Sequence, residues 1–443
     1  MGRSVFSRFI DQPETARHGE TGVRWGGASA SWDELLVRGR ALGGGVRPQR
    51  TYLVDPRAGL DALVAFFAVA TVPDTVCFWA TPECGAQISP LAPALYEVCN
   101  AGILEIERPL WGVMTSGSSG TPKMPVGYGD MLEAVAMQYD MGVIRPTFGA
   151  DEPPCAIATC LPLQFSAAFF MTVAPALFLR RDLVIFDPHD WRPLCELAQT
   201  RNVLCLSVPA VVAAGYLSIP EPIDMSRAAL LLGAGYVTRD RVVSIREKFI
   251  GAKIMNIYGT AETGAISVDR EPGHNRHVGR PIPGKPVWIR DRNDEGIGVI
   301  ATTGADCRSF SWTPDGGLVR EEPVVASTDY GHFDADGCLV LDGRCDAGEK
   351  LHGITIFPRE TERHILDLPG VIDVRVGVSI GSGGREALEA LVVGTASVDN
   401  VREHCRELVE LQRPAVFRCV SEDEAQRIYS VHGKLRVGGG QRL

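Results

Sequence analysis

Between residues 52 and 260, short apolar runs of strand-like composition alternate with segments of helical pattern. Such alternation is typical of βαβ units, and strands that are apolar throughout predict sheets covered by helices on both faces. We therefore expect an α/β fold built from layered sheets. The successive pairs are TYLVD with GLDALVAFFAVA, CAIAT with a helix near Phe169 to Leu179, DLVIF with WRPLCELAQ, NVLCLS with PAVVAAGYL, and AALLL with TRDRVVSIREKF, before a last strand in AKIMNIYG.

The pattern changes twice after this region. Beyond residue 265, short strands separated by Gly, Asp and Pro turns predict a small β-rich subdomain. Beyond the CDAGE connection we expect a compact α+β unit, with helices over PRETERHILDL and VDNVREHCRELVEL and strands over DVRVGVS, ALEALVVG and AVFRCV. Because 443 residues exceed what one core usually serves, we predict a large domain over residues 1–345 and a small domain over 346–443.

Composition argues against several kinds of partner. The net charge of -10 and the pI near 5.5 argue against nucleic acid, because phosphate binding needs a concentrated positive surface. The chain has no long apolar stretch that would span a membrane, and its N-terminus lacks the apolar core of a signal peptide, so we expect a cytoplasmic protein without a membrane partner. Twelve cysteines without a CxxC pair predict neither a disulfide framework nor a zinc cluster. The HxxH of His274 and His277 lacks a further clustered ligand.

One loop carries a chemical signal of its own. Residues 115–123 read TSGSSGTPK, directly after an apolar run. Glycines, hydroxyl side chains and a lysine in this setting suit a polyphosphate, which backbone N–H groups and a cation can hold. The loop is not a Walker P-loop, because Pro122 precedes Lys123 and Met124 follows it. Taken alone, the stretch is also compatible with a flexible surface turn.

Three further motifs accompany this loop, and the four together resemble those of the adenylate-forming superfamily, which includes acyl- and aryl-CoA synthetases, peptide-synthetase adenylation domains and firefly luciferase. The family loop TSG[ST]TGxPKG resembles TSGSSGTPKM, and its YGxTE motif resembles NIYGTAETG at 256–264. Residues 327–362 follow the family order TGD, GxLxxxGRxD and PxEIE, and YSVHGKLR at 429–436 resembles PxTxxGKxxR. The departures from these motifs are Ser119, Met124, Ala261, Thr328 and Ile428.

The resemblance implies a nucleotide site whose residues are spread along the chain. In the family the Gly-rich loop holds the β- and γ-phosphates of ATP, and Lys123 is expected to steady the leaving pyrophosphate. Asp329 corresponds to the aspartate that binds both ribose hydroxyls, Arg344 to the arginine at the ribose and phosphate, and Tyr258 to the aromatic residue on adenine. The implied nucleotide-binding residues are Thr115, Ser116, Gly117, Ser118, Ser119, Gly120, Lys123, Gly233, Ala234, Tyr258, Gly259, Thr260, Asp329 and Arg344.

The same resemblance implies the catalytic residues. Glu262 is the expected Mg²⁺ ligand, since hard oxygen donors suit that ion. Lys434 corresponds to the lysine that reaches from the small domain to bridge the substrate carboxylate and the α-phosphate. Asp346 falls at the family's hinge, and Gly353 corresponds to the glycine beside the pantetheine tunnel. Without the motif, Glu262 would be interpreted as a solvated loop residue and Lys434 as an exposed lysine near the end of the chain.

The acyl pocket is implied by CLPLQFSAAFF at 160–170 and by GAGY at 233–236, with Phe165 and Gly235 as lining residues. Phe165 stands where the family motif usually has His, so an aromatic gate is expected without proton transfer; core packing is the equal alternative. Ser166 stands where relatives that activate amino acids carry Asp, which disfavours an α-amino acid. Fewer residues precede the Gly-rich loop than in most of the family, so we expect a trimmed N-terminal part.

The implied reaction is activation of a small aryl or acyl carboxylic acid by ATP and Mg²⁺. It forms acyl-AMP with release of pyrophosphate, and the acyl group then passes to the thiol of CoA or of a carrier-protein phosphopantetheine. Two alternatives stay open. One is a ligase that transfers the acyl group to an amine or acts without a thiol, and the other is a degenerate adenylate-binding protein. The sequence names neither the acid nor the acceptor.

Overall fold

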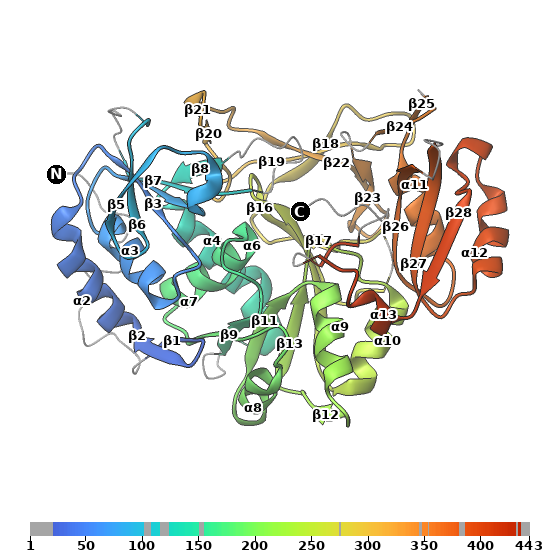
Figure 1. Ribbon diagram of the computed structural model, residues 1–443, viewed down its shortest axis with the longest axis horizontal. Helices are drawn as coiled ribbons and strands as arrows, with labels where there is room; N and C mark the ends of the chain where they lie inside the picture. The colour runs from blue at the N-terminus through green and yellow to red at the C-terminus, as the bar shows by residue number, and fades with distance from the viewer. Residues whose placement is uncertain are drawn as a thin grey trace.

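A computed structural model describes residues 21–101, 108–115, 124–149, 155–273, 276–344, 348–352, 354–380, 386–430 and 433–435 of the chain (Figure 1). Two large sheets with helices packed between and around them form its body, and smaller β-sheets and an α+β unit follow toward the C-terminus. The predicted α/β fold of layered sheets is confirmed. None of the helices in these ranges is long and apolar enough to cross a membrane.

The larger sheet has nine strands, and parallel strands make up its centre. Alternate residues of its strand β11 enter different cores: Leu204 and Leu206 face one layer of helices, while Val203 and Cys205 face α8, α9 and α10 on the other side. This two-sided burial explains why the strands are apolar throughout. The strands, in sheet order, are β17 Arg280–Pro281, β16 Gly264–Asp269, β15 Lys253–Thr260, β13 Ala228–Leu232, β11 Val203–Ser207, β9 Ala156–Thr159, β10 Leu183–Ile185, β1 Gly22–Trp25 and β2 Ala28–Ser31.

The second sheet has eight strands and packs against the first through an aromatic core. The rings of Trp111 and Phe169 stack with centroids 4.6 Å apart, and Phe66 meets both edge-on. Trp79 donates its indole N–H to the carbonyl of Leu163 at 2.6 Å, which ties the segment before Phe165 to this sheet. The strands, in sheet order, are β21 Gly317–Arg320, β20 Phe310–Thr313, β8 Met124–Tyr128, β7 Leu110–Val113, β4 Val76–Trp79, β3 Thr51–Val54, β6 Leu95–Val98 and β5 Ile88–Ala92.

Helices connect the strands of both sheets. Two helical stretches widen into π-helical turns, at Asp140–Ile144 and Phe169–Val173. The predicted helix near Phe169 to Leu179 is therefore present as three short consecutive segments rather than one regular helix. The α-helices of this part are α2 Trp32–Leu42, α3 Leu60–Ala70, α4 Met131–Tyr139, α5 Arg145–Phe148, α6 Ser166–Ala168, α7 Ala174–Phe178, α8 Arg192–Thr200, α9 Pro209–Ser218 and α10 Arg239–Lys248.

Beyond residue 265 the chain forms the expected short strands. A four-stranded antiparallel sheet lies along the top of Figure 1, and its core includes Ile266 and Tyr258 from the larger sheet. A two-stranded sheet of β12 Ile223–Asp224 and β14 Phe249–Ile250 lies at the C-terminal end of α10. The strands of the four-stranded sheet, in order, are β18 Val287–Arg290, β19 Gly298–Thr302, β22 Val325–Phe333 and β23 Leu339–Arg344.

The C-terminal unit, which we define as the described residues from 348 to 435, lies at the right of Figure 1 and has its own apolar core. Its helix α12 ends at His404, earlier than the helix predicted over VDNVREHCRELVEL. Cys405 enters the core there, and the carbonyl of Gln412 accepts a hydrogen bond from Thr361, so packing turns the chain away from a continuous helix. The elements are β24 Glu349–Leu351, β25 Ile354–Ile356, α11 Pro358–Leu366, β26 Val371–Ile380, β27 Glu386–Gly394, α12 Val398–His404, β28 Val416–Val420 and α13 Glu422–Ala425.

Candidate functional site

The carboxyl ends of the parallel strands β11, β13 and β15 meet at one edge of the larger sheet, where ligands commonly bind in open α/β folds. Gly233, directly after β13, donates its N–H to the carbonyl of Ser207 at the end of β11, at 3.2 Å. A side chain at Gly233 would also contact Ile257 of β15. Ala234 follows in the left-handed region with φ of 59°, and Gly235 lies against Pro209. The GAG segment therefore lies between the ends of β11 and β15.

Tyr258, Asp329 and Arg344 come together from three strands. The Tyr258 hydroxyl donates to Oδ2 of Asp329 at 2.8 Å, and Nε of Arg344 lies 3.9 Å from Oδ1 of the same carboxylate. Burial, followed by the negative charge of Asp329, raises the pKa of the Tyr258 hydroxyl well above its ordinary value, so this group stays a hydrogen-bond donor. The Tyr258 ring lies in the core of the four-stranded sheet, so its stacking on adenine stays a prediction.

The turn after β15 carries Glu262. Its backbone is held from both sides: the N–H of Glu262 donates to the Thr260 hydroxyl at 3.3 Å, and the carbonyl of Glu262 accepts from the N–H of Arg308 at 2.9 Å. Thr263 closes the turn by accepting the N–H of Thr260 on its hydroxyl at 2.9 Å. Gly264 has φ of 65°, and a side chain there would strike Asp306. Glu262 is thus a half-buried carboxylate on a tightly constrained turn.

A buried ion pair supports this turn from beneath. The ammonium of Lys285 donates to Oδ2 of Asp306 and to the carbonyl of Thr263, and both charged side chains are fully buried. Nothing in the sequence distinguishes this pair, because Lys285 and Asp306 lie in turns of ordinary polar composition. If either side chain moved away, the other would be left as a buried charge without a partner, which is strongly unfavourable. The pair therefore holds the backbone around Thr263 in place.

Residues 116–123 of the Gly-rich loop, including Ser116, Gly117, Ser118, Ser119, Gly120 and Lys123, lie outside the described residues. The two strands that flank the loop, β7 and β8, are antiparallel neighbours. Strand β8 is joined to the Glu262 turn, because the N–H of Ser309 donates to the carbonyl of Val126 at 2.9 Å, next to the Arg308 that holds Glu262. Both ends of the loop are therefore anchored on the same sheet as the segment that supports Glu262.

Lys434 reaches the site from the C-terminal unit. It lies on a tight turn in which the N–H of Ser430 donates to the carbonyl of Lys434 at 2.9 Å and the N–H of Gly433 to that of Ser430 at 2.8 Å. Gly433 has φ of 67°, and a Cβ there would lie 2.7 Å from Cγ2 of Val208, directly after β11. Leu435 packs on the other side into the core of the C-terminal unit. The turn is thus seated between the two parts of the chain.

Lys434 is an exposed residue whose ammonium is influenced by three arginines. Loss of hydration, followed by the positive charges of Arg359, Arg344 and Arg375, lowers the pKa of Lys434. Arg375 is itself paired with Glu362 at 3.2 Å, so part of this positive charge is already offset, and the remainder suits an anionic ligand. Arg359 and Arg375 were not among the predicted site residues, and no motif in the sequence distinguished them from surface arginines.

Contacts link the predicted residues in two groups. Tyr258 joins Asp329 and Arg344, while Gly433, next to Lys434, lies against Val208 at the end of β11. Phe165 lies apart on the segment before α6, half-buried against the main core. Asp346 and Gly353 lie outside the described residues, and so does His274 of the HxxH sequence.

Comparison with known proteins shows what this chain is similar to. Residues 102–305 match the model of the AMP-binding enzyme family. This match covers somewhat less than half of the chain. The computed structure also superposes on ATP-bound MatB from Rhodopseudomonas palustris with a TM-score of 0.68, covering 98% of this chain and 97% of MatB at 17% identity. At that identity the likeness concerns the fold alone.

Proteins similar in sequence include two kinds of enzyme. The chain is 25% identical over 72% of its length to CymA, a probable non-canonical nonribosomal peptide synthetase of Salinispora arenicola, but the match spans only 4% of that protein. It is 25% identical over 82% of its length to the sulfoacetate–CoA ligase of Cupriavidus necator, of which the match spans 71%. The proteins similar to this chain thus include a CoA ligase and a synthetase many times longer than the chain itself.

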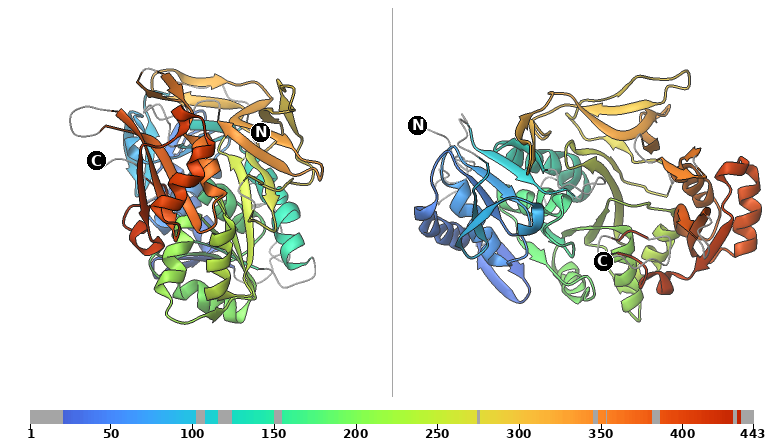
Figure 2. Two further views of the ribbon diagram at one scale, coloured as in Figure 1. Left: turned by 90° about the vertical axis from the view of Figure 1, so that its right-hand side faces the viewer. Right: turned by 45° about the horizontal axis from the view of Figure 1, so that its top comes forward.

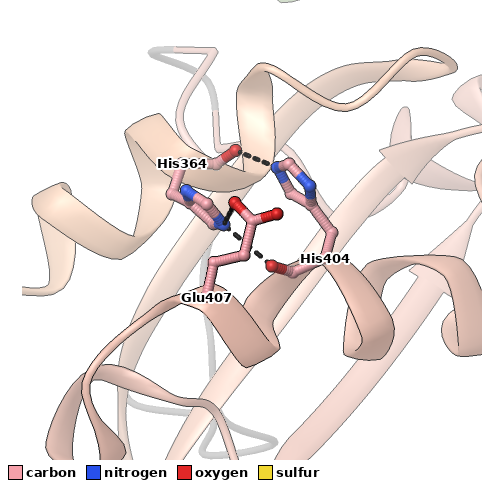
Figure 3. A group of neighbouring side chains, drawn as sticks. All are labelled: His364, His404 and Glu407. Atoms are coloured by element: carbon pink, nitrogen blue, oxygen red, sulfur yellow. Dashed lines mark hydrogen bonds and ion pairs between the residues drawn. The ribbon is translucent and has the colours of Figure 1, made fainter.

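A second cluster of possible ligands lies outside this site, in the C-terminal unit. His364, His404 and Glu407 bring their ligand atoms within 4.8 Å of one another (Figure 3). However, Nε2 of each histidine faces the backbone carbonyl of the other, at 2.9 and 2.8 Å, and the rings stack with centroids 4.1 Å apart. A carbonyl only accepts hydrogen bonds, so each Nε2 carries a proton and has no lone pair for a metal. The two histidines thus join α11 to α12 by reciprocal hydrogen bonds.

Proposed function

We propose that this protein activates a small carboxylic acid with ATP, forming acyl-AMP and pyrophosphate, and then transfers the acyl group to the thiol of CoA or of a carrier-protein phosphopantetheine. The single observation that carries the proposal is that Gly433 places the turn of Lys434 against Val208, at the same edge of the larger sheet as Gly233 and the strand end that carries Tyr258. A protein that only bound the nucleotide would not need this lysine delivered from the C-terminal unit.

Charge is the main obstacle in the first step, since a carboxylate must approach the α-phosphate of a triphosphate. A carboxylate oxygen forms a bond to the α-phosphorus while the bond to pyrophosphate breaks, and the two electrons of that bond leave with pyrophosphate. In our proposal Lys434 lies between the carboxylate and the α-phosphate, Arg344 holds the ribose and phosphate, and Asp329 holds the ribose. Arg359 and Arg375 add positive charge to the same region.

The residues present fit a Mg²⁺ ion that would accompany ATP. Glu262 offers a hard oxygen donor on a turn fixed by two backbone hydrogen bonds, and Mg²⁺ is usually held by one or two carboxylates together with substrate phosphates. When bound, the ion would neutralise developing charge on the phosphates. Ser116 to Gly120 and Lys123 would hold the β- and γ-phosphates.

In the second step the thiol sulfur would attack the acyl carbonyl, and AMP would leave. We propose that residues 346–443 act as the mobile small domain in this step, with Asp346 as the hinge and Gly353 beside the pantetheine arm. Phe165 and Gly235 would line the acyl pocket. The acceptor, CoA or a carrier protein, is distinguished by assay rather than by these residues.

Pyrophosphate exchange into ATP tests the proposal. A panel of aryl and acyl carboxylic acids is assayed with wild-type protein and with Lys434→Ala. Lys253→Ala is the matched control, because this exposed lysine lies at the opposite end of the strand that carries Tyr258. We expect at least one acid to support exchange, and we expect Lys434→Ala but not Lys253→Ala to abolish it.

The same assay separates the alternatives. ATP binding without exchange for any acid would indicate a degenerate adenylate-binding protein. Exchange without a thioester product, when CoA and then a phosphopantetheinylated carrier are supplied, would indicate transfer to an amine or another acceptor. Exchange at the wild-type rate by Lys434→Ala would contradict the proposed mechanism.

A further inference from the structure

The first turn of α10 holds the C-terminal unit against the larger sheet. The Thr238 hydroxyl donates to the carbonyl of Ile372 at 3.0 Å, and the carboxylate of Asp240 accepts the N–H of Gly370 at 2.6 Å. Figure 1 and the right-hand view of Figure 2 both show the red C-terminal segment beside the green helices α9 and α10. These contacts define one orientation of the C-terminal unit.

The next residue of this turn, Arg241, is 0% exposed and lies in a cluster of polar side chains. Its guanidinium forms an ion pair with Glu422, donates to the hydroxyl of Tyr429 at 3.3 Å and lies 3.9 Å from Asp373. Tyr216 of α9 also donates to Glu422. We call Tyr216, Arg241, Asp373, Glu422 and Tyr429 the Arg241 cluster. Two members come from the larger sheet's helices and three from the C-terminal unit.

The Arg241 cluster is satisfied only when the C-terminal unit is in this orientation. A buried guanidinium that loses its carboxylates is left as an uncompensated charge, which is strongly unfavourable. Five side chains must also meet at defined distances, so the cluster specifies geometry more than it adds stability. Movement of the C-terminal unit away from α10 would break every one of the contacts between Arg241 and that unit.

The Arg241 cluster is directly connected to the Lys434 turn. Tyr429, whose hydroxyl donates to Asp373 at 2.8 Å, precedes Ser430, and Ser430 makes the hydrogen bonds that form the turn. The position of Tyr429 therefore sets where the turn begins. A displacement there would move the turn, and Lys434 with it, away from Val208 at the end of β11.

We propose that Arg241 is a positioning residue for Lys434: through the Arg241 cluster it holds the C-terminal unit in the orientation that serves acyl-AMP formation. The inference rests on the proposed function, since it assigns Arg241 to the first of the two steps. Arg241 does not touch the site itself. Its loss should slow adenylation and leave transfer from preformed acyl-AMP to a thiol unaffected.

The test compares Arg241→Met with Arg246→Met, an exposed arginine on the same helix. Pyrophosphate exchange with the best acid measures adenylation, and thioester formation from added acyl-AMP measures transfer. We expect Arg241→Met to lower kcat for exchange about tenfold to a hundredfold, because a charged hydrogen-bond network is lost. Transfer should stay within about twofold of wild type, as should both activities of Arg246→Met. An unchanged exchange rate, or an equal fall in both activities, would overturn the proposal.

A milder variant controls for misfolding of Arg241→Met. Tyr429→Phe removes only the hydroxyl that joins Arg241 to Asp373, and it should lower exchange in the same direction by a smaller factor. Hydrogen exchange measured by mass spectrometry gives a readout independent of activity. Peptides covering Glu422 to Ser430 should exchange faster in Arg241→Met than in wild type or Arg246→Met, and equal protection in all three would contradict the positioning role.

The outcomes also separate this inference from the proposed function. If no acid supports exchange in wild type, the proposed reaction fails, whereas the hydrogen-exchange comparison still decides whether Arg241 holds the C-terminal unit. If wild type is active and both Arg241→Met and Tyr429→Phe retain its exchange rate, only the positioning role fails.

Discussion

Gly433→Ala is the substitution whose effect follows most directly from the geometry. Gly433 has φ of 67°, and its Cβ would lie 2.7 Å from Cγ2 of Val208 and 3.3 Å from Cβ of Ala210. The left-handed backbone disfavours alanine by about 1–2 kcal/mol. The turn must also retreat by roughly 1 Å to restore ordinary contacts near 3.5–4.0 Å. Both effects act on the residue adjacent to Lys434.

The displacement of the turn sets the expected loss of activity. A displacement of roughly 1 Å in a catalytic group can reduce the rate by about 100-fold. We therefore expect Gly433→Ala to lower kcat for pyrophosphate exchange by about 30-fold to 100-fold at saturating ATP and acid, corresponding to about 2–3 kcal/mol. Binding of ATP should change little, because the nucleotide-binding residues on the larger sheet are untouched.

Two companion variants separate the effect of backbone strain at Gly433 from the effect of the steric clash with Val208. Gly337→Ala has a comparable backbone, with φ of 76°, but nothing lies within 4 Å of its Cβ, so exchange should be unaffected. Adding Val208→Ala to Gly433→Ala removes Cγ2 and should restore part of the rate. If Gly433→Ala exchanged pyrophosphate within about twofold of wild type, the seating of this turn would be irrelevant to the reaction and the reasoning refuted.

Two further predictions concern charge. Lys434 must be protonated to act as a cation, and lost hydration and the charges of three arginines lower its pKa. We therefore expect kcat/KM for ATP to fall as the pH rises through a value below the pKa of an ordinary lysine. An active Lys434→Arg variant should lack this fall at alkaline pH. Lys285→Met leaves Asp306 buried without its partner and should destabilise the fold by about 3–5 kcal/mol in urea unfolding, while Lys285→Met with Asp306→Leu should recover much of that loss. A double variant no more stable than Lys285→Met would contradict the second prediction.

Local pattern predicted most elements of the larger sheet. Every strand expected between CAIAT and AKIMNIYG is present, because runs buried on both faces must be apolar throughout. The helix expected over VDNVREHCRELVEL shows the limit of that reasoning. Its periodic pattern extends past His404, but the helix stops because Cys405 and Gln412 make contacts with α11 and its core that periodicity cannot reveal.

The residues of the candidate site also fall into two groups, those that the sequence could identify and those that it could not. Tyr258, Glu262, Asp329, Arg344 and Lys434 could be named from the sequence because each stands in a short motif whose order and spacing resemble a known family. Arg359, Arg375, Arg241 and the buried pair of Lys285 with Asp306 could not, since an arginine or lysine in a polar segment has the same sequence signature whether it faces water or a carboxylate.

The sequence by itself determined which residues are chemically competent and which segments are strands and helices, because both depend on a few neighbouring positions. Only the tertiary structure decided that Gly433, next to Lys434, lies against Val208, and that Arg241 is buried in contact with Tyr429, which leads to the same turn. The first of these contacts joins residues 225 positions apart. Their energies depend on burial and on the simultaneous fit of many side chains, which no local pattern records.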